Sequence, residues 1–131
     1  MPGRLDALGL VVEDITRSAA FYRAVGVDVP EYGGEDHFEV TLPNGVRLMW
    51  DTAELIKQID PSWEKPAGGH HLALAFACDS PADVDATYNA ALAAGGTSKL
   101  PPWDAFWGHR YAQVLDPDGQ PVDFFAPLDA A

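Results

Sequence analysis

Apolar residues in the first part of the chain change from strand spacing to helical spacing. Residues 8–12 form a short apolar run rich in valine and leucine, which predicts a buried strand. Asp14 follows at the position of a helix N-cap. Apolar residues then recur every third or fourth position as far as Tyr22, and Gly26 stands where a helix commonly ends. We therefore expect a strand and then a helix over residues 5–25.

Residues 37–50 alternate apolar and polar side chains on both sides of Asn44 and Gly45. This dipeptide between alternating segments predicts a β-hairpin. Residues 29–34 could form another short strand, although Pro30 and a pair of glycines weaken that interpretation. Residues 51–60 favour a short helix, because Asp51 has capping-box spacing to Glu54.

The second half repeats the order of the first. Residues 72–76 predict a strand, and Ser80 and Pro81 begin a helix that ends at Gly95 and Gly96. Residues 111–115 and 122–125 predict two strands joined by a turn at 116–119. FYRAVG near the end of the first helix matches TYNAALAAG near the end of the second.

This internal match predicts an α+β fold of two βαβββ modules that form a cupped mixed sheet. The modules cover about residues 1–60 and 68–131, with a linker at about 61–69, and together make one domain of 131 residues. One helix cannot cover both faces of a sheet, so we expect the modules to pack together.

The composition excludes several partners. The formal net charge is −12, with 8 basic against 20 acidic side chains, which disfavours nucleic acid and anionic membranes. A neutral or cationic small ligand is compatible with this charge. Cys78 stands alone, so it has no partner for an intrachain disulfide. The N-terminus lacks the pattern of a signal peptide, and we expect a cytoplasmic protein.

The chain resembles the vicinal oxygen chelate superfamily, also called the glyoxalase/bleomycin-resistance/dioxygenase fold. Residues 11–14 before a helix with FYR at 21–23 carry the resemblance, together with DPDG at 116–119 and VDFF at 122–125. Residues 47–52, 60–63, 102–112 and 122–128 are also similar to mitomycin-resistance proteins of antibiotic producers. The resemblance implies a homodimer that sequesters a planar antibiotic of mitomycin, bleomycin or enediyne type.

Enzymes of this superfamily hold a divalent metal with His and Glu ligands. The resemblance places two of those ligand positions at Ala7 and Met49, which offer no suitable donor, and a third at Asp123. The fourth lies near residues 71–73, where His71 is an ambiguous candidate. We therefore expect no metal, no cofactor and no catalytic residue.

Aromatic residues are the main candidates for binding a ligand. Flat indole rings suit stacking on a flat ligand, and their faces attract cations. We interpret residues 99–110 as a ligand-binding loop, although core packing is the alternative for each ring. Polar candidates could accept or donate hydrogen bonds to a ligand. The full set of expected ligand-binding residues is Trp107, Trp103, Trp50, Phe106, Tyr111, Asp51, His37, Tyr32, His109 and Asp123.

The leading hypothesis from the sequence is an antibiotic-binding self-resistance protein. It would bind drug in an aromatic cleft at the dimer interface, to which both chains contribute residues. The alternative is a metal-dependent lyase, isomerase or dioxygenase of the same superfamily. A third hypothesis is a redox role, in which a reduced quinone drug is bound and reoxidised.

Overall fold

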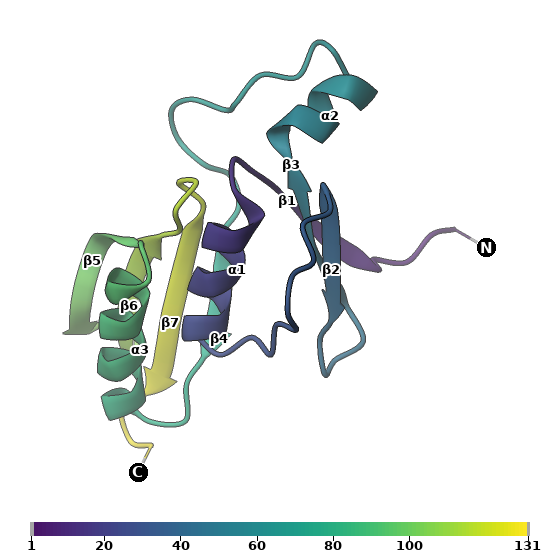
Figure 1. Ribbon diagram of the computed structural model, residues 1–131. Coiled ribbons are helices and arrows are strands. Elements are labelled where there is room, and N and C mark those ends of the chain that lie inside the picture. The colour runs from purple at the N-terminus through teal and green to yellow at the C-terminus, as the bar shows by residue number, and fades with distance from the viewer. Residues whose placement is uncertain (1, 131) are drawn as a thin grey trace. The chain divides into compact units, whose positions relative to one another are not determined.

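The computed structural model describes residues 2–130 and divides the chain into two compact units, the first ending at Ala67 and the second beginning at Gly68 (Figure 1). The first unit combines two helices, and the second a single helix, with a mixed sheet, which confirms the α+β fold class. No helix within residues 2–130 is long and apolar enough to cross a membrane.

The first unit contains a three-stranded sheet in the order β1-β3-β2. β1 runs parallel to β3, and β2 pairs with β3 in antiparallel fashion. Its elements are β1 (Ala7–Val12), α1 (Ile15–Ala24), β2 (His37–Thr41), β3 (Arg47–Thr52) and α2 (Ala53–Ile59).

Local sequence signals account for most of these boundaries. The side chain of Asp14 accepts a hydrogen bond from the amide of Arg17 and caps α1, as the sequence predicts. Gly45 has a φ of 88° in the turn between β2 and β3, a conformation that favours glycine. The possible strand at 29–34 is absent, because Pro30 has no amide hydrogen to give to a sheet.

Two residues of β3 differ from their expected roles. Thr52, not Asp51, caps α2, with its side chain accepting from the amide of Leu55 at 3.1 Å. Trp50 is completely buried, and its indole N–H donates to the Ser18 hydroxyl at 3.0 Å. A buried indole needs such an acceptor, so the Trp50 side chain is part of the core and has no surface for a ligand.

The second unit contains a four-stranded sheet in the order β4-β7-β6-β5. β4 is parallel to β7, and the β7-β6 and β6-β5 pairs are antiparallel. Its elements are β4 (Leu74–Ala77), α3 (Pro81–Ala93), β5 (Thr97–Asp104), β6 (His109–Leu115) and β7 (Pro121–Pro127).

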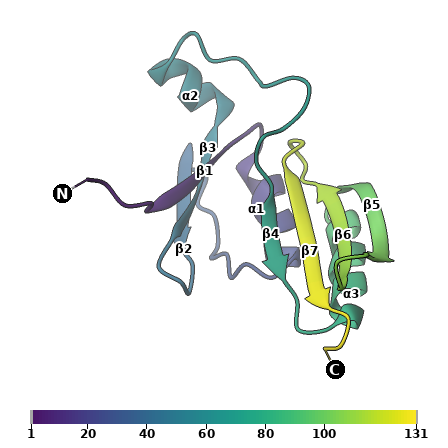
Figure 2. The same cartoon turned by 180° about the vertical axis from the view of Figure 1, so that it is seen from behind.

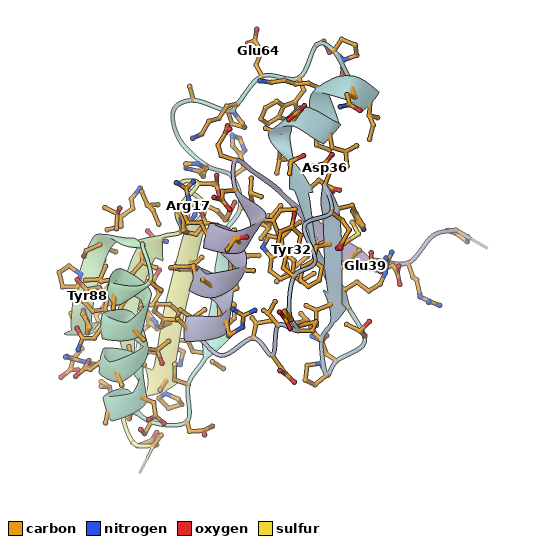
Figure 3. The ribbon with its side chains drawn as sticks, viewed as in Figure 1. Arg17, Tyr32, Asp36, Glu39, Glu64 and Tyr88 are labelled. Atoms are coloured by element: carbon orange, nitrogen blue, oxygen red, sulfur yellow. The ribbon has the colours of Figure 1, made fainter. Side chains whose placement is uncertain are left out.

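Helix α3 covers one face of this second sheet, packing on β5, β6 and β7. Its buried residues Val84 and Ala91 belong to a core that also contains Val114, Val122 and Phe124. At the edge of α3, the Tyr88 hydroxyl donates to the hydroxyl of Ser98 on β5 at 2.7 Å (Figure 3). The opposite face of the sheet carries a different set of side chains.

The interpretation of residues 99–110 as a loop is wrong for most of that segment. Residues as far as Asp104 belong to β5, and a tight turn at 105–108 leads into β6. The pairing of β5 with β6 has register shifts on both sides of Leu100, near Pro101 and Pro102. Prolines cannot donate to a ladder but are tolerated on an edge strand, which is why the sequence pattern concealed β5.

We expect Trp50→Ala to be strongly destabilising, because it empties a large buried volume and removes the donor to Ser18. Truncating a buried aromatic side chain costs about 3–5 kcal/mol of unfolding free energy. Urea denaturation followed by circular dichroism measures this loss. The control is Trp63→Ala, at a partly exposed indole beside Lys57, which should change the unfolding free energy by less than about 1 kcal/mol. Equal losses in the two variants would contradict the core role of Trp50.

Candidate ligand-binding surface

The face of the second sheet that α3 leaves uncovered is the candidate site (Figure 2). Side chains alternate between the two faces of a strand, so residues paired directly across neighbouring strands share a face. Trp103 pairs with Tyr111, Tyr111 with Phe125, and Gln113 with Asp123. These residues therefore form one continuous face, opposite the buried residues that pack under α3.

Aromatic rings gather where β5 turns into β6. We call Trp103, Phe106, Trp107 and Tyr111 the aromatic cluster. The Trp107 ring lies 5.6 Å from Trp103, 5.0 Å from Phe106 and 5.4 Å from Tyr111, measured between centroids. The turn that presents these rings closes through a hydrogen bond from the Ala105 amide to the His109 carbonyl at 2.8 Å.

The cluster is open to solvent. Phe106 is 91% exposed, Trp107 47% and Trp103 38%. Exposed large aromatic side chains that lie next to one another mark an interaction surface more often than isolated ones do. The exposure of these three rings argues against the core packing that was the alternative for each.

The rings of the aromatic cluster meet edge to face. Trp107 makes interplanar angles of 89° with Trp103, 90° with Phe106 and 70° with Tyr111. Perpendicular rings form corners, so Trp107 and any one of these neighbours do not form a parallel-sided slot for a flat molecule. A flat ligand can instead stack on one exposed ring face while a neighbouring ring borders its edge.

The cluster leads directly to a half-buried carboxylate. Asp123 accepts a hydrogen bond from the Tyr111 hydroxyl at 2.8 Å and another from the Gln113 side-chain amide at 2.6 Å. Burial and the neighbouring Asp123 carboxylate raise the pKa of Tyr111 to about 12. Tyr111 therefore keeps its proton at neutral pH and remains a donor to Asp123.

His109 fixes one side of the cluster. The indole N–H of Trp107 donates to Nδ1 of His109 at 3.2 Å, and the His109 ring lies 5.4 Å from Phe125. Accepting at Nδ1 places the proton of the neutral imidazole on Nε2. His109 thus orients the Trp107 ring and offers its own Nε2–H as a donor.

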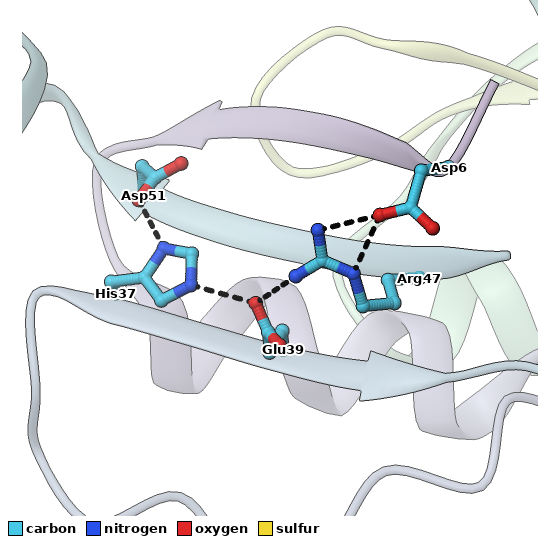
Figure 4. Close-up of polar contacts among 5 residues, drawn as sticks. All are labelled: Asp6, His37, Glu39, Arg47 and Asp51. Atoms are coloured by element: carbon cyan, nitrogen blue, oxygen red, sulfur yellow. Dashed lines mark hydrogen bonds and ion pairs between the residues drawn. The ribbon is translucent and has the colours of Figure 1, made fainter. Parts of the chain in front are cut away.

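The other expected polar residues lie in the first unit. There a row of charged side chains spans β2 and β3 and ends at Asp6, the residue before β1 (Figure 4). Arg47 bonds to Asp6 at 2.9 Å and to Glu39 at 2.8 Å. His37 bonds to Glu39 through Nε2 at 2.9 Å and to Asp51 through Nδ1 at 2.6 Å. We call these five residues the charge ladder.

Each member of the charge ladder alters the titration of its neighbours. Hydrogen bonds to Asp51 and Glu39 raise the pKa of His37. Bonds from His37 and Arg47 lower the pKa of Glu39. Because basic and acidic groups alternate along the ladder, protonation of His37 leaves two positive charges against three negative ones.

Tyr32 belongs to the segment before β2 (Figure 3). Its ring packs edge to face on Phe38 with centroids 5.3 Å apart, and its hydroxyl donates to the Glu35 carbonyl. The expected site residues thus fall into separate places. Six of them come together in the second unit: Trp103, Phe106, Trp107, His109, Tyr111 and Asp123. In the first unit, His37 and Asp51 are in contact, and Tyr32 lies apart from the charge ladder. Trp50 is in the core.

Gln113 and Phe125 complete the candidate surface but were absent from the expected residues. The strand alternation could have identified both, because Gln113 stands two positions from Tyr111 and Phe125 two from Asp123. Glu39 and Arg47 could have been added to His37 and Asp51 by the same reasoning.

Comparison with known proteins identifies the family. Residues 4–124 match the model of the Glyoxalase/Bleomycin resistance protein/Dioxygenase superfamily. The chain belongs to this superfamily. No curated protein matches it significantly in sequence.

Several solved structures share the fold. A glyoxalase/bleomycin resistance protein/dioxygenase from Nocardioides is 25% identical, with a TM-score of 0.73, over 100% of this chain and 87% of that one. A family enzyme from Burkholderia phytofirmans PsJN is 20% identical, with a TM-score of 0.80, over 96% and 100%. TioX from Micromonospora sp. ML1 is 23% identical, with a TM-score of 0.60, over 96% and 100%.

The residues of this superfamily member do not fit the metal that the resemblance attributes to its enzymes. Ala7 and Met49 lie on the same face of the first sheet as the charge ladder, and neither offers an oxygen or nitrogen side-chain donor. Asp123 already accepts from two neutral donors, and His71 is exposed outside the strands. Residues 2–130 contain no group of three or more His, Cys, Asp or Glu side chains able to hold a metal ion.

We expect the charge ladder to make folding stability depend on pH. The pKa of His37 is higher in the folded state than in the unfolded state. The stabilisation that His37 contributes to folding is therefore fully present below the unfolded pKa of about 6.5, and it is lost as pH rises through the folded pKa. Urea midpoints measured from about pH 5 to 9 should therefore fall on the alkaline side in the wild type. His37→Gln should flatten that fall, whereas His70→Gln, at an exposed histidine in the segment before β4, should leave it unchanged. If the urea midpoint of His37→Gln depends on pH as the wild type does, His37 is not the source of the alkaline fall.

Proposed function

We propose that this protein binds a planar aromatic or quinone-type antibiotic on the aromatic cluster and protects the cell by sequestering it. The observation that carries the proposal is the exposure of Trp103, Phe106 and Trp107 beside one another at the end of a sheet face. Binding lowers the free drug concentration by mass action, so no bond chemistry is needed. The similarity of residues 102–112 to mitomycin-resistance proteins supports this choice of ligand class.

Drug contact on the cluster would bury large apolar area. An aromatic side chain offers about 150–250 Å² of contact area, and stacking adds a preference for flat rings. Trp107 lies at the centre of the cluster, in contact with the other three rings. Loss of Trp107 should therefore weaken drug binding more than loss of any other single ring.

The proposal includes a homodimer in the cytoplasm, with residues of both chains lining each cleft. Its support is the same sequence resemblance, because the mitomycin-resistance type of protein implies such a dimer. Sedimentation analysis tests the assembly, and a monomer at micromolar concentration would remove this part of the proposal.

Titration with mitomycin, bleomycin and anthraquinone drugs, followed by tryptophan fluorescence, tests the binding function. We expect at least one drug to quench the fluorescence, and Trp107→Ala to weaken its binding about tenfold or more because the stacking ring is lost. Trp63→Phe is the matched control, since it removes an indole of the first unit and should leave affinity unchanged. Absence of quenching by all three drug classes would overturn the proposal.

The same experiment separates sequestration from catalysis. We expect drug extracted after incubation to be chemically unchanged by mass spectrometry. We also expect protein purified without chelator to contain far less than one divalent ion per chain. Stoichiometric metal that is lost in Asp123→Ala, or a converted drug, would instead support the lyase, isomerase or dioxygenase alternative.

A further inference from the structure

Asp123 has no cationic partner among the residues that the structure describes. Its two hydrogen-bond donors, the Tyr111 hydroxyl and the Gln113 amide, are both neutral. The carboxylate is half-buried on the sheet face, where water screens its charge less than at an open surface. Its hydrogen bonds are satisfied, but no ion pair within residues 2–130 offsets its charge.

The lysine and arginine of the second unit are not placed to supply that charge. Lys99 and Arg110 are the Lys and Arg residues after position 68. Arg110 lies one position from Tyr111 on β6 and so faces the other side of the sheet. There its guanidinium bonds to Asp85 and Asp104, each at 3.0 Å. Lys99 makes no ion pair with Asp123 in the described structure.

This contrast separates the two polar surfaces of the protein. In the charge ladder, Arg47 and His37 alternate with three carboxylates, so each carboxylate has a basic neighbour, which is positive for Asp51 when His37 is protonated. On the candidate surface the carboxylate has only neutral neighbours, although the unit is rich in aspartate. The charge ladder is therefore internally complementary, whereas the surface at Asp123 is complementary to a cation from outside the unit.

The aromatic cluster adds a second, independent feature that suits a cation. A positive group is attracted to the face of an aromatic ring, most strongly to tryptophan, and perpendicular rings present two faces to one corner. Trp107 and Trp103 meet at 89°, and Trp107 and Tyr111 at 70°. The cation–π contact found within residues 2–130 joins Lys57 to Trp63, so none of the chain's described cations occupies the cluster.

Tyr111 connects the two features. Its ring lies 5.4 Å from that of Trp107, and its hydroxyl bonds to Asp123 at 2.8 Å. An ammonium group beside this ring can lie against an aromatic face and also reach the carboxylate. A flat ring attached to that ammonium can stack on the exposed indole of Trp107.

We propose that the ligand of this surface is an organic cation, a flat ring system with a protonated nitrogen, in the ring or attached to it, that pairs with Asp123 within the aromatic cluster. The inference rests on the proposed drug-binding function and specifies the chemical class of its ligand. It makes charge, together with stacking, a determinant of specificity.

Calorimetric titration at about pH 8 with two flat probes tests the inference. 9-Aminoacridine is a cation at this pH, whereas acridine has the same ring system and is neutral. We expect 9-aminoacridine to bind about tenfold more tightly in low salt, and added salt to reduce this preference. Asp123→Asn should bring the two affinities within about twofold of each other, mainly by weakening the binding of the cation.

Asp104→Asn is the matched control, because it removes a carboxylate from the other face of the same sheet. It should keep the full preference for the cation. Thermal melts establish that each variant is folded, and if Asp123→Asn does not fold, the wild-type preference and its salt dependence decide the question.

The outcomes distinguish this inference from the function on which it rests. Two results would overturn the cation proposal and leave aromatic drug binding standing. One is that acridine and 9-aminoacridine bind with equal affinity. The other is that Asp123→Asn lowers the affinity for both probes equally. Failure of both probes, and of the antibiotics above, would overturn the two together.

Discussion

The alternation of side chains along β-strands is the constraint on which the rest of this structure depends. One helix packs on only one face of a sheet, so every second residue of a covered strand joins the core and its neighbours face the other way. On β6, Ala112 and Val114 are completely buried, while Tyr111 and Gln113 are available for hydrogen bonding to Asp123. Core and candidate site are therefore interleaved within a few residues, and a shift of one position in register would exchange them.

The sequence predicted the elements that local chemistry determines. Asp14 and Ser80 cap helices, and the Asn44-Gly45 and 116–119 turns each join two antiparallel strands as expected, because these signals depend on neighbouring residues alone. It failed at β5, where two prolines interrupt the apolar pattern of an edge strand. It also placed Trp50 in the site, because a strand pattern does not reveal which face of the strand becomes the core.

The sequence predicted which residues form the candidate site better than it predicted how they are arranged. All six second-unit residues expected to bind a ligand lie together, and five of them are close in sequence around one turn. Their perpendicular ring packing and the lack of a counter-charge at Asp123 depend on three-dimensional arrangement, and no spacing in the sequence expresses either. The net charge of −12 suggested only that a cation was compatible, whereas the arrangement around Asp123 points to one specific carboxylate.

The tight turn at 105–108 has a consequence for how this surface can change. Ala105 is buried and Gly108 has a φ of 94°, so these two positions hold the backbone of the turn. Phe106 and Trp107, between them, project from a hairpin tip whose exposed side chains contribute little to the α3-packed core. Evolution or a laboratory library could therefore vary these two positions freely and alter ligand preference at little cost in folding. The fold of such a protein would persist while the surface at the turn changed.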